Sequence, residues 1–223
     1  MLKISIALAA ITIFLSSFLL FQVQPLLSKY ILPWFGGSPA VWTVSVLFYQ
    51  TLLIVGYAYA YWSIRRLTPF WQMAAHAGLI LVALLTLPIL PESSWRPTAL
   101  DDPTWHILKL LAATIGIPYI MLASTGPLLQ RWLHRSHPAI SPYPLYALSN
   151  GASLLALISF PIAVEPFLGS EAQARVWSIS FVLFALASTL NALWFWRNKS
   201  SVSEPASATP PLTPPSVRTK MLW

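Results

Sequence analysis

Polar side chains inside long apolar stretches are the residues of this sequence that could bind or move a solute. Burying such groups in a lipid bilayer costs free energy, so they are the first place to look for function. The candidate substrate-binding residues are Gln24, Lys29, Gln50, Tyr119, Ser124, Thr125, Tyr146, Asn150 and Glu165. Each of them also has a purely structural interpretation.

Gln24 and Lys29 lie on either side of Leu26 and Leu27, after the first apolar run. They could face a polar cavity, or they could lie among the outer headgroups. In the second case the Lys29 ammonium reaches water along its apolar stem, and we favour this interpretation for Lys29. Glu165, next to Pro166, could attract cations or serve as a solvated helix end.

Two of the amides inside the apolar runs are candidate site residues. Gln50 lies near the middle of its run and is expected to bond to another helix more readily than to a ligand. Asn150 needs a hydrogen-bonding partner, because an unpaired buried amide is costly. His76 could relay protons, but we expect an ordinary interfacial histidine beside Trp71.

The fourth apolar run contains Pro118 and Pro127, which predict a discontinuous or bent helix. The hydroxyls of Ser124 and Thr125 could line a substrate path there, or they could bond to the carbonyls that the prolines leave free. Two aromatic rings, those of Tyr119 and Tyr146, could hold ammonium groups by cation–π contact.

Signals of a self-sufficient enzyme are missing. The chain has no Cys, which excludes disulfides and thiolate chemistry. It has no G-x-G-x-x-G, Walker A, H-E-x-x-H or G-x-S-x-G sequence. We therefore expect no cofactor, no metal and no catalytic residue, and no nucleic acid as a partner.

The elements that must position these residues are membrane helices. Of the 223 residues, 57% are hydrophobic and only 9% charged, which excludes an ordinary soluble domain. Helices satisfy their own backbone groups in lipid, and each run is long enough, or nearly so, to cross it. The sequence predicts an all-α, polytopic protein with one six-helix transmembrane domain over residues 1–198. The six runs are Ile4–Phe21, Val41–Tyr61, Met73–Leu90, Ile107–Leu129, Leu145–Val164 and Val176–Phe195.

Basic residues predict the orientation, because they concentrate on the cytoplasmic side of membrane proteins. Most of them lie at the amino terminus, in the second and fourth loops and after the sixth run, which all fall on one side of the membrane. We therefore expect a multi-pass protein with both termini cytoplasmic. The residues on that side are Lys3, Arg65, Arg66, Arg131, Arg135, Arg197 and Lys199. After the transmembrane domain, residues 199–223 are rich in Pro, Ser and Thr, and this composition predicts a disordered cytoplasmic tail.

Several ordered motifs carry a family resemblance. They are FQVQPLLSKYILPWFGGSPAVW at 21–42, STGPLLQ at 124–130, PLYALSNGASLLA at 144–156 and VEP at 164–166. Together they resemble the amino-terminal membrane region of bacterial fused major-facilitator/spermidine-synthase-like proteins. The resemblance implies a half-major-facilitator-like bundle in the bacterial inner membrane, and it extends to about Trp196.

The resemblance also implies a link to polyamines. It implies a transporter-like module for spermidine or related cations, completed by a homodimer or by a separate protein. The alternative is a non-catalytic membrane anchor for a separate spermidine-synthase-like enzyme. The synthase-like domain that follows this region in the family has no counterpart in these 223 residues, so none of its catalytic residues is carried over.

Overall fold

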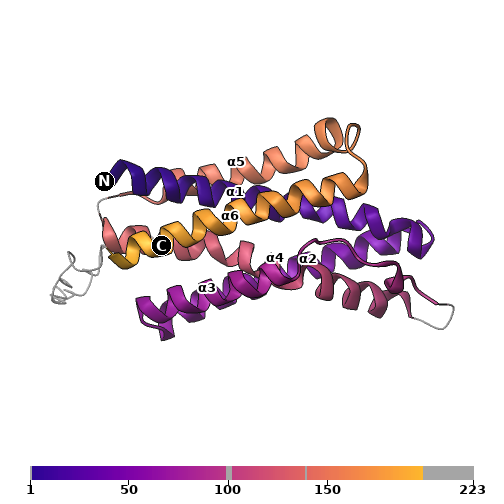
Figure 1. Cartoon of the computed structure of the whole chain (residues 1–223), viewed down its shortest axis with the longest axis horizontal. Helices are drawn as coiled ribbons and strands as arrows, with labels where there is room; N and C mark the ends of the chain where they lie inside the picture. Colours follow the sequence, from indigo (N-terminus) through magenta and orange to yellow (C-terminus); the bar gives the residue numbers. More distant parts are fainter. Residues whose placement is uncertain (1, 99–101, 139, 198–223) are drawn as a thin grey trace, which may run out of the picture.

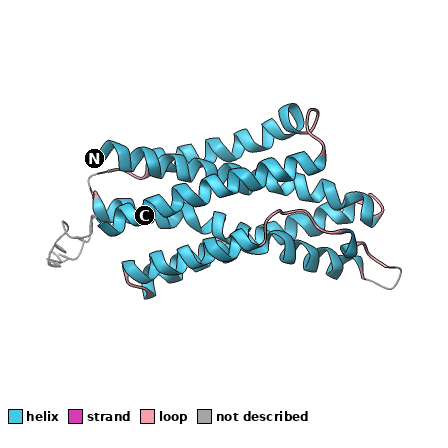
Figure 2. Cartoon of the chain, viewed as in Figure 1, coloured by secondary structure: helices cyan, strands magenta, loops and turns pink. Residues whose placement is uncertain are grey.

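The computed structural model describes residues 2–98, 102–138 and 140–197, and every long element in these ranges is a helix (Figure 2). Short 3₁₀ turns follow the first helix (η1, Leu32–Phe35) and precede the fourth (η2, Ser93–Trp95), and a π-helical turn (η3, Phe160–Val164) extends the fifth. The predicted all-α class is confirmed, whereas the predicted tail at 199–223 lies outside the described residues. The long helices are α1 Leu2–Ile31, α2 Pro39–Arg66, α3 Pro69–Leu85, α4 Pro103–Ser136, α5 Tyr143–Ser159 and α6 Ser170–Arg197.

Five of the six helices are long and apolar enough to cross a membrane. The exception is α3, whose 17 residues rise about 26 Å. The sequence predicted the span Met73–Leu90, whereas the helix begins four residues earlier, at Pro69, and ends at Leu85. Pro88 explains the earlier end, because a proline disfavours helical backbone in the residue before it. The structure therefore supports five of the six predicted spans by length.

Large apolar side chains cover the outside of the bundle. Ile54 and Leu85 are 68% and 84% exposed, whereas the polar side chains of Ser45, Gln72 and Ser188 are fully buried. A water-soluble domain places charged and polar groups outside. This distribution instead fits a bundle surrounded by lipid.

Prolines mark where several helices begin. α2, α3 and α4 each have Pro at the first helical position, where its fixed φ is already helical and its missing N–H is not needed. Asp102 caps α4, because its carboxylate accepts the backbone N–H groups of Thr104 and Trp105 at 2.9 and 3.1 Å. Ahead of α2, Gly36 and Gly37 adopt φ of +75° and +68°, a left-handed turn that favours glycine.

The helices form two groups joined through α1 and α4. α1 packs against α5 and α6, whereas α4 packs against α2 and α3, and α1 also contacts α4 directly (Figure 1). The chain can be divided into two triplets of consecutive helices, α1–α3 and α4–α6. The first helix of each triplet packs against the second and third helices of the other. α2 and α5 lie beside this central pair without a substantial contact between them, and α3 contacts α6.

The closest approach involves α2 and α4. A Cβ atom placed on Gly56 would lie 2.6 Å from the Ala123 Cβ and 3.1 Å from the Ile120 carbonyl oxygen. Only a residue without a side chain allows this spacing, because carbon atoms in contact normally lie about 3.5–4.0 Å apart. Gly56 therefore sets the distance between the two helices.

The fourth helix is continuous, contrary to one expectation. α4 runs unbroken through Pro118 and Pro127 from Pro103 to Ser136, so a discontinuous helix is wrong and a bent one stays a prediction. The helix is held on several sides by α1, α2 and α3, and such neighbours allow a membrane helix to retain internal prolines.

Candidate functional site

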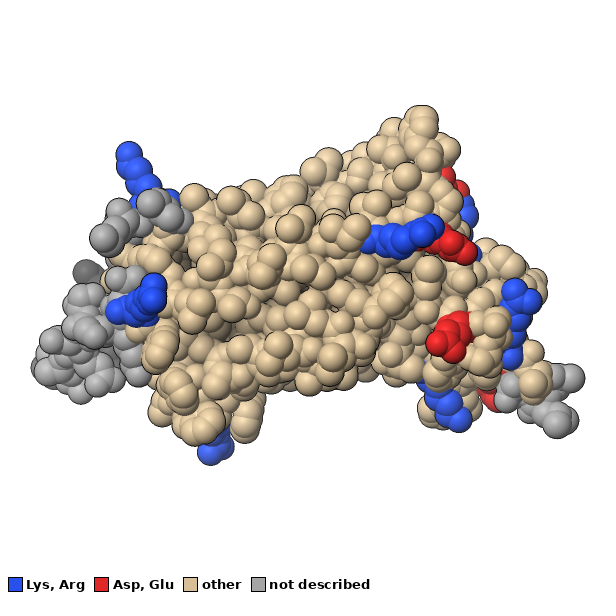
Figure 3. Space-filling model, in the orientation of Figure 1, with Lys and Arg blue, Asp and Glu red and all other residues tan. Residues whose placement is uncertain are grey.

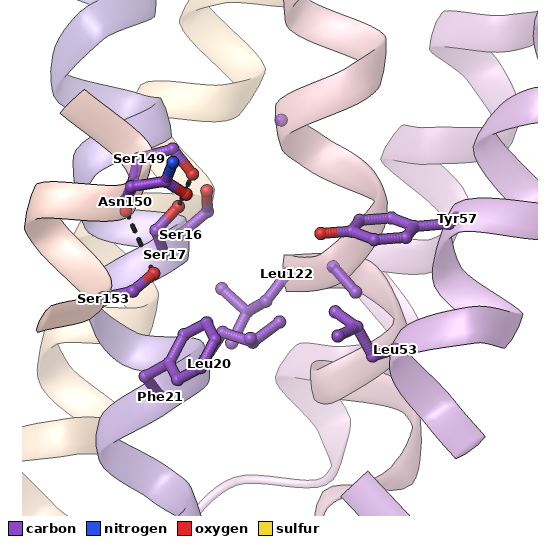
Figure 4. A pocket seen from close by; sticks show the side chains of 12 residues that line it. Ser16, Ser17, Leu20, Phe21, Leu53, Tyr57, Leu122, Ser149, Asn150 and Ser153 are labelled. Carbon is purple, nitrogen blue, oxygen red and sulfur yellow. Dashed lines mark hydrogen bonds between the residues drawn. The ribbon is translucent and has the colours of Figure 1, made fainter. Parts of the chain in front are cut away.

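A cleft of about 180 Å³ opens between α1 and α5 on one side and α2 and α4 on the other (Figure 4). It is the junction between the two helix groups, at the side where α2 and α5 remain apart. Its wall combines hydroxyl, amide and apolar side chains. The lining residues are Ser16, Ser17, Leu20, Phe21, Leu53, Tyr57, Leu122, Ala123, Gly126, Ser149, Asn150 and Ser153.

Serines from α1 and α5 form one wall of the cleft. The hydroxyls of Ser17 and Ser149 are hydrogen-bonded at 2.7 Å, and the Ser153 hydroxyl donates to the Ser149 carbonyl at 3.0 Å. Asn150 projects from the same turn of α5, and its side chain is exposed. Figure 4 shows Tyr57 across the cleft, with its hydroxyl pointing toward this polar wall.

The lining contains no carboxylate, ammonium or guanidinium group. Serine hydroxyls and the Asn150 amide can both donate and accept hydrogen bonds, which suits an uncharged polar group such as an alcohol or amide. The aromatic rings of Phe21 and Tyr57 are the lining groups that could attract a cation by cation–π contact. The cleft thus favours small polar solutes without requiring a charge on them.

Asn150 is the predicted site residue that lines the cleft. Ser16, Ser17 and Tyr57 also line it, but they are not among the site residues predicted from the sequence. The signal was present for the serines, because they are two adjacent hydroxyls in the middle of the first apolar run. What the sequence could not show is which helix they face.

Gln24 and Tyr119 come together elsewhere. The Gln24 amide donates to the Tyr119 hydroxyl at 3.0 Å, which joins α1 to α4. The Tyr119 ring is 1% exposed and lies 5.3 Å from the Tyr49 ring of α2. This contact holds three helices together, and Tyr119 has no free face to offer an ammonium group.

Ser124 and Thr125 are fully buried and do not line the cleft. Both hydroxyls donate to the Met121 carbonyl, at 3.0 and 2.8 Å. That carbonyl is not one of those freed by the prolines, so neither interpretation made from the sequence is supported.

A buried polar cluster joins α3 to α4. His76 is 2% exposed, its Nε2 lies 3.4 Å from the Thr125 hydroxyl, and its ring packs edge-on against Trp132. The Trp132 indole N–H donates to the Gln72 side-chain oxygen at 2.9 Å. The expectation of an interfacial His76 beside Trp71 is therefore wrong, because the histidine faces the inside of the bundle.

Lys29 and Glu165 form an ion pair at one end of the bundle, between α1 and the end of η3. The sequence had suggested that Lys29 reaches the headgroups by itself and that Glu165 attracts a solute cation or ends a helix in water. In the structure the two side chains instead pair with each other. Gln50 is exposed on α2, and it has no hydrogen bond to another helix among the residues that the structure describes. Tyr146 is 54% exposed on α5 and does not line the cleft.

No group of three or more His, Asp or Glu side chains gathers to hold a metal ion within residues 2–98, 102–138 and 140–197. Comparisons with protein families, curated proteins and solved structures found no match to this chain. The family resemblance, the polyamine link and the anchor alternative therefore stay predictions.

Proposed function

We propose that this chain is a transporter-like membrane module whose solute site is the cleft between α1, α2, α4 and α5. The observation that carries the proposal is the exposure of Asn150 and Tyr57 in the middle of long apolar helices. Polar side chains at such positions face a protein neighbour or a water-filled cavity, because exposure to lipid tails is costly. A polar cleft of this kind fits a passage for a small solute.

The packing pattern supports a transporter-like arrangement. α1 and α4 run in opposite directions, and each packs with the second and third helices of the other triplet. Two triplets related in this inverted way are the construction used by many secondary transporters, which bind their substrates between repeats. We infer that α1–α3 and α4–α6 are such repeats, and that the bundle is half of a larger unit.

The cleft needs a second unit to close it. Gln50 on α2 and Asn150 on α5 are both exposed on the two helices that border the opening. A second copy of the chain or a separate membrane protein that covers this side would supply partners for both amides.

The charge distribution supports cytoplasmic termini in the proposed topology. α1 begins and α6 ends at the same end of the bundle (Figure 1). On the face shown in Figure 3, the acidic side chains lie at the opposite end, and basic ones occur at both ends. Basic loops favour the cytoplasm, so the end shared by Lys3 and Arg197 is assigned to that side.

Single cysteines test the water-filled cleft, because the chain has none of its own. We expect Asn150→Cys and Tyr57→Cys to react with a charged, membrane-impermeant thiol reagent, since the reactive thiolate forms only where water reaches it. Ile54→Cys is the control, because Ile54 is 68% exposed on the same helix as Tyr57 but does not line the cleft. Equal, slow reaction at all three positions contradicts the proposal.

Uptake into proteoliposomes tests the solute class. The purified chain is reconstituted, and uptake of labelled spermidine is compared with that of a neutral polyol. The uncharged lining favours the neutral solute, whereas the resemblance favours spermidine. If neither solute enters above the level of empty vesicles, although the chain is folded and the thiol of Asn150→Cys is water-accessible, a passage formed by this chain and its own copies is refuted for these two classes.

A further inference from the structure

A second hollow lies between α3 and α6, and it differs in character from the cleft. It measures about 190 Å³ and shares no lining residue with the cleft. Alanines from both helices form much of its surface, and larger apolar side chains border it. The lining residues are Phe70, Met73, Ala74, Ala77, Thr189, Ala192, Leu193 and Trp196.

This groove offers few hydrogen bonds to an occupant. Thr189 is the one hydroxyl in its lining, and it donates to the Ala185 carbonyl of its own helix at 2.8 Å. The indole N–H of Trp196 is the other side-chain donor among the lining residues. Apolar cavities do not hold ordered water, because a water molecule needs polar partners. The groove therefore suits a hydrocarbon chain.

Arginines lie beside one end of the groove. Phe70 is four residues after Arg66, which ends α2, and Trp196 directly precedes Arg197, which ends α6. Arg65, Arg66 and Arg197 are exposed, and in the described part of the chain none of them is paired with a carboxylate. The Arg65 guanidinium lies 4.6 Å from the centre of the Tyr61 ring.

The apolar groove suits an acyl chain, and the arginines near its end suit a negatively charged headgroup. We propose that the α3–α6 groove holds an acyl chain of an anionic phospholipid, with its phosphate bound by arginines among Arg65, Arg66 and Arg197. Guanidinium groups bind phosphate by paired hydrogen bonds, and basic residues at a membrane surface favour anionic headgroups. Phe70 and Trp196 are 46% and 54% exposed and lie near these arginines in the sequence. Aromatic rings are enriched at the membrane–water interface, where a lipid headgroup also lies.

Native mass spectrometry of the full chain tests this proposal. The purified protein is titrated with phosphatidylglycerol and with phosphatidylcholine of the same acyl chains. We expect tighter binding of the anionic lipid, and a loss of about fivefold in that preference for each arginine changed to glutamine. Arg66→Gln and Arg197→Gln are the test variants, and Arg175→Gln, at the other end of α6, is the control.

A pair of alanine variants tests the position of the chain. Ala74→Leu fills the groove and is expected to weaken binding of both lipids, whereas Ala75→Leu, also exposed but outside the lining, should bind as wild type does. Both leucines face outward, so both variants should fold, which circular dichroism checks. Equal affinity of the wild type for the two lipids overturns the proposal. Wild-type lipid binding by Ala74→Leu overturns it as well.

Discussion

The spacing between α2 and α4 gives the sharpest stability prediction. In Gly56→Ala, the new Cβ would lie 2.6 Å from the Ala123 Cβ, and the normal contact distance is about 3.5–4.0 Å. The helices must therefore separate by about 1 Å, or the local packing must distort. Overpacking of this kind costs about 1–3 kcal/mol. Replacing a helical glycine by alanine otherwise gains up to about 1 kcal/mol.

Gly126→Ala is the matched control. Gly126 lies in α4, and a Cβ placed there meets nothing within 4 Å. It keeps the gain in helix propensity without the clash, so the difference between the two variants isolates the overpacking cost. We expect Gly56→Ala to be less stable than Gly126→Ala by about 1–3 kcal/mol in reversible unfolding from detergent micelles.

A second substitution tests the contact itself. Ala123→Gly in the Gly56→Ala background removes the 2.6 Å contact but leaves the Ile120 carbonyl oxygen at 3.1 Å. Ala123→Gly itself costs up to about 1 kcal/mol of helix propensity. We therefore expect Gly56→Ala to cost less in the Ala123→Gly background than in the wild type. If Gly56→Ala unfolds at the same denaturant concentration as Gly126→Ala, the close approach of α2 and α4 is not present in the protein.

Three further substitutions are measured in the same unfolding assay. Asn191→Leu removes amide hydrogen bonds from α6 to α1 and should destabilise the bundle by about 1–3 kcal/mol, with no loss contradicting that link. Trp132→Phe leaves the buried Gln72 oxygen without its indole donor, so a similar loss is expected, and wild-type stability would mean that the bond is absent. Glu165→Gln should cost less than about 1 kcal/mol, because both partners of its ion pair with Lys29 are partly exposed; a larger loss would show a stronger pair.

Helix content and approximate ends follow from local sequence. Apolar runs of about 20 residues predict membrane helices, and Pro39, Pro69 and Pro103 mark three helix starts. The third span was placed too far toward the C-terminus, because the apolar composition continues to Leu90 while the helix begins at Pro69 and ends before Pro88. Apolar composition indicates which residues favour lipid, but it does not indicate at which residue the helical backbone ends.

The candidate site was only partly predictable. Asn150 was found because an amide in an apolar run stands out from its neighbours. Ser17 was missed, since serine hydroxyls in helices commonly bond to a carbonyl of their own turn and need no second helix. Tyr57 was missed, since tyrosine is common near the ends of membrane helices as an interface anchor. The ion pair of Lys29 with Glu165 joins residues 136 positions apart, and nothing local indicates it.

The sequence by itself determined that this chain is helical, that its long helices are apolar and that its charges gather at helix ends, because these properties depend on neighbouring residues. The tertiary structure decided which faces meet. α1 and α4 carry polar side chains on more than one side, so their sequences do not specify the rotation of each helix about its own axis. Only packing around α1 and α4 turns Ser17, Ser149 and Asn150 toward the cleft and buries Thr125 with His76.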